Sequence, residues 1–208
     1  DAKAYVAMLE DLDREVGRVL AALDKHKLTE NTLVIFVSDN GGFAGAANMG
    51  PLRGAKSTTL EGGIRVPLIM RWPGHIRPGT TSHQVCATFD LTCSILRLAG
   101  AGVDPERLDG FDIVDYTSQG KPAFARTLFW RGKRGERTWW AVREGDLKYV
   151  RKTEGETQEW LFDLSKDPGE TKDLRSARPG QFKRLKERLA EWEQDVEARD
   201  KAGTRSAE

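Results

Sequence analysis

The chain has 208 residues, of which 31% are charged and 38% hydrophobic, and its formal net charge is +1. That length can form one large domain or two small ones around a sizeable core. The near-zero net charge gives no reason to expect nucleic acid or an anionic membrane as a partner. No apolar run approaches the roughly 20 residues of a membrane-spanning helix. Two cysteines, Cys86 and Cys93, are too few to indicate a disulfide framework.

The first predicted element is a helix that is already under way by Ala4. Its apolar residues recur at spacings of three and four, which predicts one apolar face; they are Tyr5, Met8, Leu9, Leu12, Val16, Val19, Leu20 and Leu23. The cationic stretch 25–27 suits the negative end of the helix dipole. Because no initiator methionine or signal-peptide pattern precedes the helix, we expect the chain to be part of a longer protein.

Two buried-looking strands follow, separated by a long loop. Leu33–Val37 is apolar and rich in β-branched residues, which predicts a strand covered on both faces. The glycine-rich stretch 41–63 has little periodicity, and loops of that length in compact domains are usually functional or disordered. Val66–Arg71 predicts a second strand, which we expect to pair with the first. These elements favour an α/β fold.

The hydrophobic pattern changes in the second half of the chain, from long apolar segments to short alternating ones. Before it, 84–87 is interpreted as a short strand and Asp90 as the cap of a helix that ends at Gly100. The polar stretch Tyr116–Pro122 is interpreted as a loop, and a subdomain boundary is expected near 116–124. Beyond it, short alternating segments predict a small antiparallel sheet and a final amphipathic helix; the segments are Thr127–Trp130, Trp139–Arg143, Leu147–Arg151 and Trp160–Asp163, and the helix carries Phe182, Leu185, Leu189, Trp192 and Val196.

Asp39 and Asn40, directly after the first strand, are candidate metal ligands. Side chains at the carboxyl end of a strand in an open α/β sheet emerge where ligands bind, and carboxylate and amide oxygens suit a hard cation. Gly41 and Gly42 can adopt the positive φ that a sharp exit needs. Asn-Gly is also a strong hairpin signal, so on spacing alone a structural turn is an equal alternative. Lys56 in the same loop is either a solvated charge or a donor to an anion.

Five motifs in this order resemble the carboxyl-terminal half of the sulfatase family, the arylsulfatase-like branch of the alkaline phosphatase superfamily. They are SDNGG (38–42), NxxPLRGAK (48–56), LEGGIRVPLIMRWPG (60–74), LDG (108–110) and LFDLSKDPGE (161–170). The resemblance implies part of a mixed sheet between helices in residues 1–120, the catalytic α/β domain. It implies a smaller subdomain with a short antiparallel sheet and a terminal helix in 121–208.

The resemblance also implies roles for three residues. Asp39 and Asn40 match the pair that coordinates the active-site divalent cation, usually Ca²⁺. Lys56 matches the lysine that binds the sulfate oxygens and supports the charge on the leaving oxygen, so we expect it to be catalytic and substrate-binding. We interpret Arg53 and the Glu61-Gly62-Gly63 stretch as structural.

The nucleophile of the family is absent from this chain. Sulfatases use a formylglycine made from Cys or Ser in a C-x-(P or A)-x-R motif, and in the family that motif lies in the amino-terminal half. Cys93 begins a similar spacing that ends at Arg97, but Ile95 stands where Pro or Ala is expected and the segment is an apolar helix. We interpret Cys93 as a small buried residue, and the three histidines, His26, His75 and His83, as structural or solvated. The chain alone is therefore expected not to hydrolyse sulfate esters.

Two alternatives stay open. The longer protein could be a phosphonate or phosphodiester hydrolase of the same superfamily, or this chain could be a non-catalytic remnant that binds an anion or a partner. If the chain is a truncated part of a longer protein, the apolar surface and sheet edge left uncovered predict self-association. Expected substrates are aryl or carbohydrate sulfate esters. The sequence leaves localisation unknown, and the resemblance implies a periplasmic, extracellular or lysosomal protein.

Overall fold

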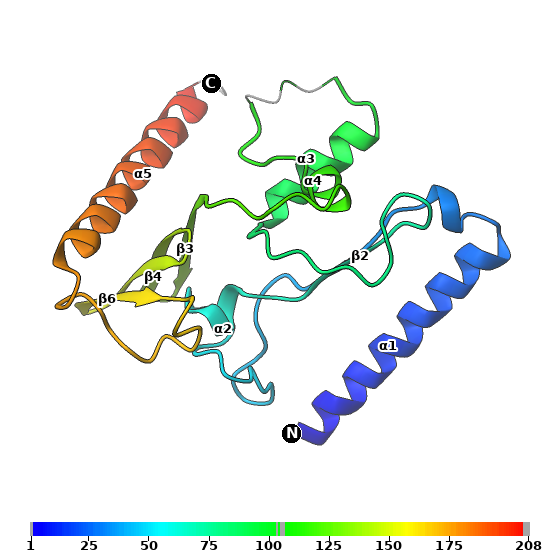
Figure 1. The fold of residues 1–208 in the computed structure, drawn as a ribbon. Coiled ribbons are helices and arrows are strands. Elements are labelled where there is room, and N and C mark those ends of the chain that lie inside the picture. Colours follow the sequence, from blue (N-terminus) through cyan, green and yellow to red (C-terminus); the bar gives the residue numbers. More distant parts are fainter. Residues whose placement is uncertain (1, 103, 105–106, 206–208) are drawn as a thin grey trace. The chain divides into compact units, whose positions relative to one another are not determined.

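The computed structural model describes residues 2–102, 104 and 107–205, with side chains described as far as residue 201 (Figure 1). The chain divides into two compact units. The first contains Asp1–Leu12, Val37–Leu68 and Arg126–Glu208, and the second contains Asp13–Phe36 and Ile69–Ala125. The predicted division at 120/121 stays a prediction.

The predicted amino-terminal helix is confirmed as α1 (Ala2–Lys25), which contributes residues to both units. The chain leaves the helix through Lys27, which has a φ of 56°, and forms one 3₁₀ turn, η1 (Thr29–Asn31). None of the residues of α1 is buried. Several of its apolar residues are exposed, with Met8 at 68% and Val19 at 58%, and the others are partly buried.

The two predicted strands form and pair with each other. They are β1 (Val34–Val37) and β2 (Leu68–Arg71), and together they make a two-stranded sheet. The short helix α2 (Glu61–Ile64) precedes β2. The α/β class is therefore confirmed.

In the second unit, α3 (Thr88–Leu98) packs against α4 (Ile113–Ser118). Asp90 is not the cap residue, because the helix begins two residues earlier. Its carboxylate instead accepts from the amide of Ala87 at 2.7 Å and from that of Phe111 at 3.1 Å. The amide of Val114 donates to Ser94 Oγ at 3.1 Å, so α3 fixes the start of α4.

The prediction of a short strand at 84–87 is wrong, since this segment has no strand geometry. The buried side chain of Gln84 makes the contacts that a neighbouring strand would otherwise make. Its Oε1 accepts from the amide of Phe124 at 2.9 Å, and its Nε2 donates to the carbonyl oxygen of Val85 at 2.9 Å. The Gln84 side chain therefore forms hydrogen bonds with backbone groups that a paired strand would otherwise form.

The first unit contains the predicted antiparallel sheet, in the order β3-β4-β5-β6. Its strands are β3 (Thr127–Arg134), β4 (Arg137–Glu144), β5 (Leu147–Glu154) and β6 (Glu156–Asp163). The three turns each begin with a glycine at positive φ, a conformation that other residues rarely adopt; these are Gly135, Gly145 and Gly155.

Different parts of the chain pack on the two faces of this sheet. Helix α5 (Pro179–Arg205) lies along one face (Figure 1), where Leu185 and Leu189 pack on Val142, Tyr149 and Leu161. On the opposite face, Leu60 from the segment before α2 packs on a core cluster of Trp139, Ala141, Val150, Phe162 and Leu164. The loop that carries the predicted site therefore rests on the sheet.

Candidate functional site

The Asp39-Asn40 pair lies in the bend that follows β1. Ser38 Oγ donates to the backbone oxygen of Asn40 at 2.8 Å, which turns the chain at the strand end. The Asp39 side chain is exposed and that of Asn40 is partly buried. Within the described residues, the Asp39 carboxylate has no ion-pair partner in the structure. Its oxygens are therefore accessible to a cation.

Gly41 closes this bend by a very close backbone contact. Its amide donates to the carbonyl oxygen of Gly63 at 2.9 Å. A Cβ atom at Gly41 would lie 1.8 Å from the carbonyl oxygen of Gly62. The expectation that Gly41 and Gly42 serve a positive φ is wrong, since neither has one. Glycine is needed at Gly41 because another backbone approaches it.

Lys56 is joined to the same bend through its backbone. Its amide donates to the carbonyl oxygen of Gly42 at 3.0 Å, while its side chain is exposed. In the part of the chain that the structure describes, no carboxylate lies within ion-pair distance of its ammonium. Ser57 follows with a φ of 77°, which is uncommon for a residue other than glycine. The backbone thus brings the Asp39-Asn40 bend and Lys56 together. Among the described residues, the ammonium of Lys56 has no carboxylate partner.

This arrangement excludes the hairpin alternative for Asn40-Gly41. The partner of β1 is β2, which begins at Leu68. The intervening loop is folded on itself, since the amide of Gly62 donates to the carbonyl oxygen of Arg53 at 2.7 Å. The described residues contain no group of three or more His, Cys, Asp or Glu side chains placed to hold a metal ion.

A buried ion cluster lies beneath this loop. The ammonium of Lys148 is 2.8 Å from Glu61 Oε1 and 2.9 Å from Glu170 Oε1. The motifs indicate only an architectural role for Glu61. Glu170 ends the motif 161–170 without an assigned role, and Lys148 lies in none of the five motifs. No local pattern could have joined them, because Glu61 is 87 residues from Lys148 and 109 from Glu170.

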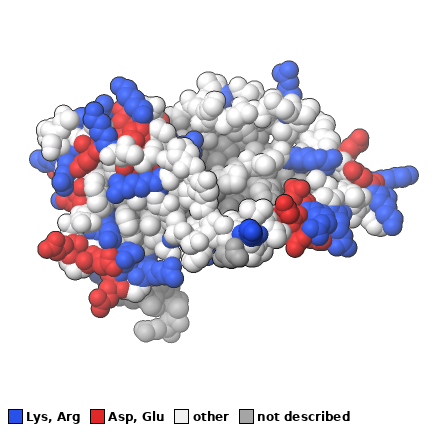
Figure 2. Space-filling view, turned by 90° about the horizontal axis from the view of Figure 1, so that it is seen from below, with Lys and Arg blue, Asp and Glu red and all other residues white. Residues whose placement is uncertain are grey.

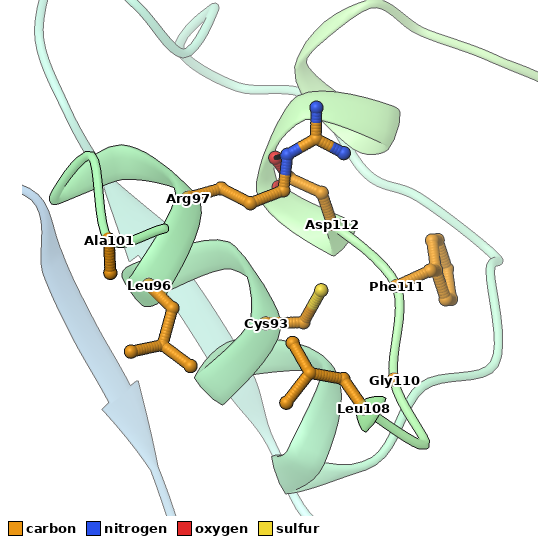
Figure 3. A pocket seen from close by; sticks show the side chains of 8 residues that line it. All are labelled: Cys93, Leu96, Arg97, Ala101, Leu108, Gly110, Phe111 and Asp112. Carbon is orange, nitrogen blue, oxygen red and sulfur yellow. Dashed lines mark ion pairs between the residues drawn. The ribbon is translucent and has the colours of Figure 1, made fainter. Parts of the chain in front are cut away.

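Cys93 lies in the second unit, on α3, and is 4% exposed. Its sulfur points into a cavity of about 160 Å³ lined mainly by apolar side chains (Figure 3). Arg97 and Asp112 form an ion pair at 3.7 Å beside it. This burial fits the interpretation of Cys93 as a core residue.

All three histidines are exposed in the second unit, and none of them is on the loop that carries Lys56. His75 stacks on the ring of Trp72 with 3.9 Å between centroids. On the face drawn in Figure 2, cationic and anionic side chains are intermixed and form no extended surface of one sign. Among the described residues, no helix has the length and apolar character to cross a membrane.

Two protein-family models match this chain. The model for "Sulfatase" matches residues 1–101, the range that includes Asp39, Asn40 and Lys56. The model for "N-sulphoglucosamine sulphohydrolase, C-terminal" matches residues 55–196. The chain belongs to the sulfatase family. The resemblance inferred from the five motifs is thereby confirmed.

Individual proteins are similar to this chain in sequence and in structure. Human arylsulfatase A is 36% identical over 192 residues, which are 80% of this chain and 38% of that protein. The crystal structure of Ps i-CgsB in complex with k-i-k-neocarrahexaose is 28% identical, with a TM-score of 0.81 over 92% of this chain and 43% of that one. The chain thus spans less than half the length of these two proteins, and its alkaline-phosphatase-like fold is confirmed.

A phosphonate hydrolase shares the fold as well. The phosphonate monoester hydrolase of Agrobacterium radiobacter is 23% identical, with a TM-score of 0.65 over 92% of this chain and 40% of that one. At that identity the likeness concerns the fold alone. The fold by itself therefore does not distinguish sulfate from phosphonate esters.

Proposed function

We propose that this chain is a carboxyl-terminal portion of a metal-dependent sulfatase, an enzyme that hydrolyses sulfate esters. The observation that carries the proposal is the backbone connection of Lys56 to the Asp39-Asn40 bend through Gly42, 3.0 Å from amide to oxygen. It connects Lys56, whose exposed ammonium can bind an anion, to Asp39 and Asn40, whose side-chain oxygens can bind a metal ion. All three residues lie in one unit of a sulfatase-family chain. Membership of the family supports the reaction type.

Asp39 and Asn40 are the residues that would hold the divalent cation, expected to be Ca²⁺. The exposed carboxylate and the adjacent amide are hard oxygen donors, which fits such an ion. Calcium takes about six to eight oxygen ligands, so this pair supplies part of a ligand set and the longer protein supplies the rest. When bound, the cation provides positive charge that stabilises the oxygens of the ester.

Lys56 binds the sulfate group in this proposal. Its ammonium is a compact donor without a carboxylate partner among the described residues, and it suits a tetrahedral anion. As the ester bond breaks, the same charge stabilises the leaving oxygen. The nucleophile, a formylglycine, belongs to a part of the longer protein outside this chain, so the chain alone is inactive.

The substrate class we favour is a sulfated saccharide. The family model for an N-sulphoglucosamine sulphohydrolase matches residues 55–196, and the neighbouring structure of Ps i-CgsB contains an oligosaccharide. Aryl sulfates remain useful as general probes of sulfatase activity. A phosphonate or phosphodiester ester is the second candidate, supported by the shared fold of the Agrobacterium hydrolase.

Two experiments test the proposal. Sequencing the coding DNA upstream should find an in-frame C-x-P-S-R or C-x-A-x-R motif, and an in-frame stop codon directly upstream would count against it. The encoded longer protein should hydrolyse aryl sulfate faster than aryl phosphonate, and Lys56→Met should abolish that turnover. The matched control is Lys183→Met, which removes a lysine with a 78% exposed side chain from α5. Faster turnover of the phosphonate would favour the second candidate.

A further inference from the structure

Three charged side chains are buried together in the first unit. Lys148 of β5 and Glu170 are 0% exposed, and Glu61 of α2 is 2% exposed. Lys148 contacts both carboxylates, at 2.8 Å and 2.9 Å. Charges persist in a protein interior only when they are paired and hydrogen-bonded. The single positive charge of Lys148 is therefore shared by two carboxylates that come from distant parts of the chain.

Glu170 is bound to both ends of the segment that contains Lys56. At its beginning, Arg53 Nη1 donates to the backbone oxygen of Glu170 at 2.9 Å. At its end, the amide of Glu61 donates to Glu170 Oε2 at 2.6 Å. The segment 53–61 is thus a loop whose two ends are held by one residue of another part of the unit.

The backbone around Glu170 is shaped for this contact. Glu170 has a φ of 53°, a region that residues other than glycine rarely occupy unless the surroundings impose it. A Cβ atom at the preceding Gly169 would lie 2.7 Å from the carbonyl oxygen of Pro51. The segment that follows the sheet therefore packs directly against the start of the loop.

The cluster also reaches the Asp39-Asn40 bend. Glu61 begins α2, and the next two residues make the close contact with Gly41. The loop and the bend thus share one anchor, the start of α2.

Lys148 is the cation in direct contact with this cluster. Arg143 and Arg65 approach Glu61 Oε2 only to 3.8 Å and 3.9 Å. Burial raises the pKa of the Glu170 carboxyl, and the adjacent Lys148 opposes that rise. Without Lys148, the buried Glu170 carboxylate would keep the hydrogen bond from the amide of Glu61, and the Glu61 carboxylate would keep only the more distant Arg143 and Arg65.

We propose that Lys148 is a positioning residue of the sulfatase site. Its ammonium holds Glu61 and Glu170 together, and through them it holds the loop 53–61 in the conformation that presents Lys56 beside the Asp39-Asn40 bend. The part of this proposal that concerns sulfate rests on the proposed function of Lys56. The part that concerns the loop does not.

The test uses the 208-residue chain and the variant Lys148→Met, with amide hydrogen exchange as the local measurement. The reporters are the amides of Gly41, Lys56 and Gly62, which make the hydrogen bonds of the bend and the loop. Their exchange should accelerate about tenfold or more, because removal of one partner leaves buried charges unpaired. Amides between β3 and β4, away from the cluster, should change much less. The control is Lys152→Met, on the same strand and face, where the lysine pairs with Glu154 at 2.8 Å.

A second variant shows whether the faster exchange in Lys148→Met comes from unpaired buried charges or from a general failure of the chain to fold. The triple variant Glu61→Gln/Lys148→Met/Glu170→Gln removes all three charges and keeps side chains of similar size. It should restore protection of the loop amides to within a fewfold of the wild type. Equal acceleration in the loop and throughout the sheet, or unchanged loop amides in a folded Lys148→Met chain, would overturn the proposal.

Titration with inorganic sulfate separates this proposal from the function on which it rests. Wild-type chain should bind sulfate at Lys56, and Lys148→Met should weaken that binding about tenfold, in step with the loss of loop order. If the loop amides respond as expected but the wild type binds no sulfate, the positioning role stands and the proposed role of Lys56 fails. If sulfate binds equally well to both chains, the positioning role fails.

Discussion

The backbone amide of Lys56 donates a 3.0 Å hydrogen bond to the carbonyl oxygen of Gly42, while its ammonium lies in solvent. The backbone of this residue therefore contributes to the structure of the loop through a hydrogen bond, whereas its side chain makes no such contribution. This separation allows the side chain to be removed without disturbing the loop. It also means that the charge at this position is available to a ligand.

We expect Lys56→Met to lose sulfate binding while its unfolding free energy stays within about 0.5 kcal/mol of the wild type, as for most exposed substitutions. Heteronuclear NMR titration with sodium sulfate measures the first and chemical denaturation the second. Lys183→Met is the control for loss of a positive charge on the surface. Equal sulfate shifts in the Lys56→Met and wild-type chains would rule out the assigned site.

Gly41→Ala should destabilise the first unit, because its Cβ would lie 1.8 Å from the carbonyl oxygen of Gly62. Overpacking against backbone costs about 1–3 kcal/mol. Gly132→Ala in β3 is the matched control, since a Cβ there meets nothing within 4 Å. Urea unfolding of the two variants compares them directly, and equal midpoints would show that the bend can open without cost.

Calcium should bind this chain weakly, with a dissociation constant of about 10⁻³ M or weaker, because Asp39 and Asn40 supply only part of the usual ligand set. Asp39→Asn should abolish the residual heat in calorimetry, whereas Asp13→Asn on α1 should leave it unchanged. Sub-micromolar affinity would contradict the view that further ligands lie elsewhere.

The stability of the sheet should fall at high pH because of Tyr149. Burial, followed by the hydrogen bond that its hydroxyl donates to Glu159, raises the pKa of this phenol far above its usual value of about 10. The folded chain therefore retains a proton that the unfolded chain releases. This contribution is complete below pH about 10 and is lost as the pH rises above it.

The difference in near-ultraviolet phenolate absorbance between wild type and Tyr149→Phe isolates this group. The Tyr149 signal should appear only together with unfolding, and in denaturant it should appear near pH 10, the usual value. A Tyr149 phenolate that forms at about pH 10 in the folded chain would show that the phenol is not protected.

Exposed apolar residues on α1 should make the chain self-associate. Met8 and Val19 are 68% and 58% exposed, and neighbouring apolar residues extend the same surface. In sedimentation velocity, the Met8→Glu/Val19→Glu variant should be monomeric at concentrations where the wild type forms larger species. Arg18→Glu on the same helix is the control for added negative charge. A wild type that stays monomeric and binds a specific ligand would favour the non-catalytic alternative.

Regular elements with a strong pattern were predictable from the sequence. The β-branched run before Ser38 indicates β1, and the alternating segments after residue 126 indicate the four-stranded sheet. The helix α4 was missed, because it has only six residues and begins where the Asp112 side chain accepts from the amide of Asp115. Such a short helix leaves no apolar period.

The candidate site was predictable only in part. Asp39, Asn40 and Lys56 lie within one stretch, and their motifs identify them as site residues. Those assignments remain predictions. The contact of Gly41 with Gly62 and the pairing of Lys148 with Glu61 depend on segments that meet only in the folded chain. No periodicity or composition encodes such contacts.

The anchoring of both ends of the Lys56 loop by Glu170 has a consequence for protein engineering. A shortened chain that stops at residue 120 keeps Asp39, Asn40 and Lys56 but removes Lys148 and Glu170, and it leaves Glu61 as a carboxylate with no ammonium to receive it. The strands and the segment after them, which carry none of the expected ligands, are thus part of the minimal piece in which those ligands can be studied. We therefore expect that a chain suited to the study of this site contains both Val37–Leu68 and Arg126–Glu208, which belong to the same compact unit.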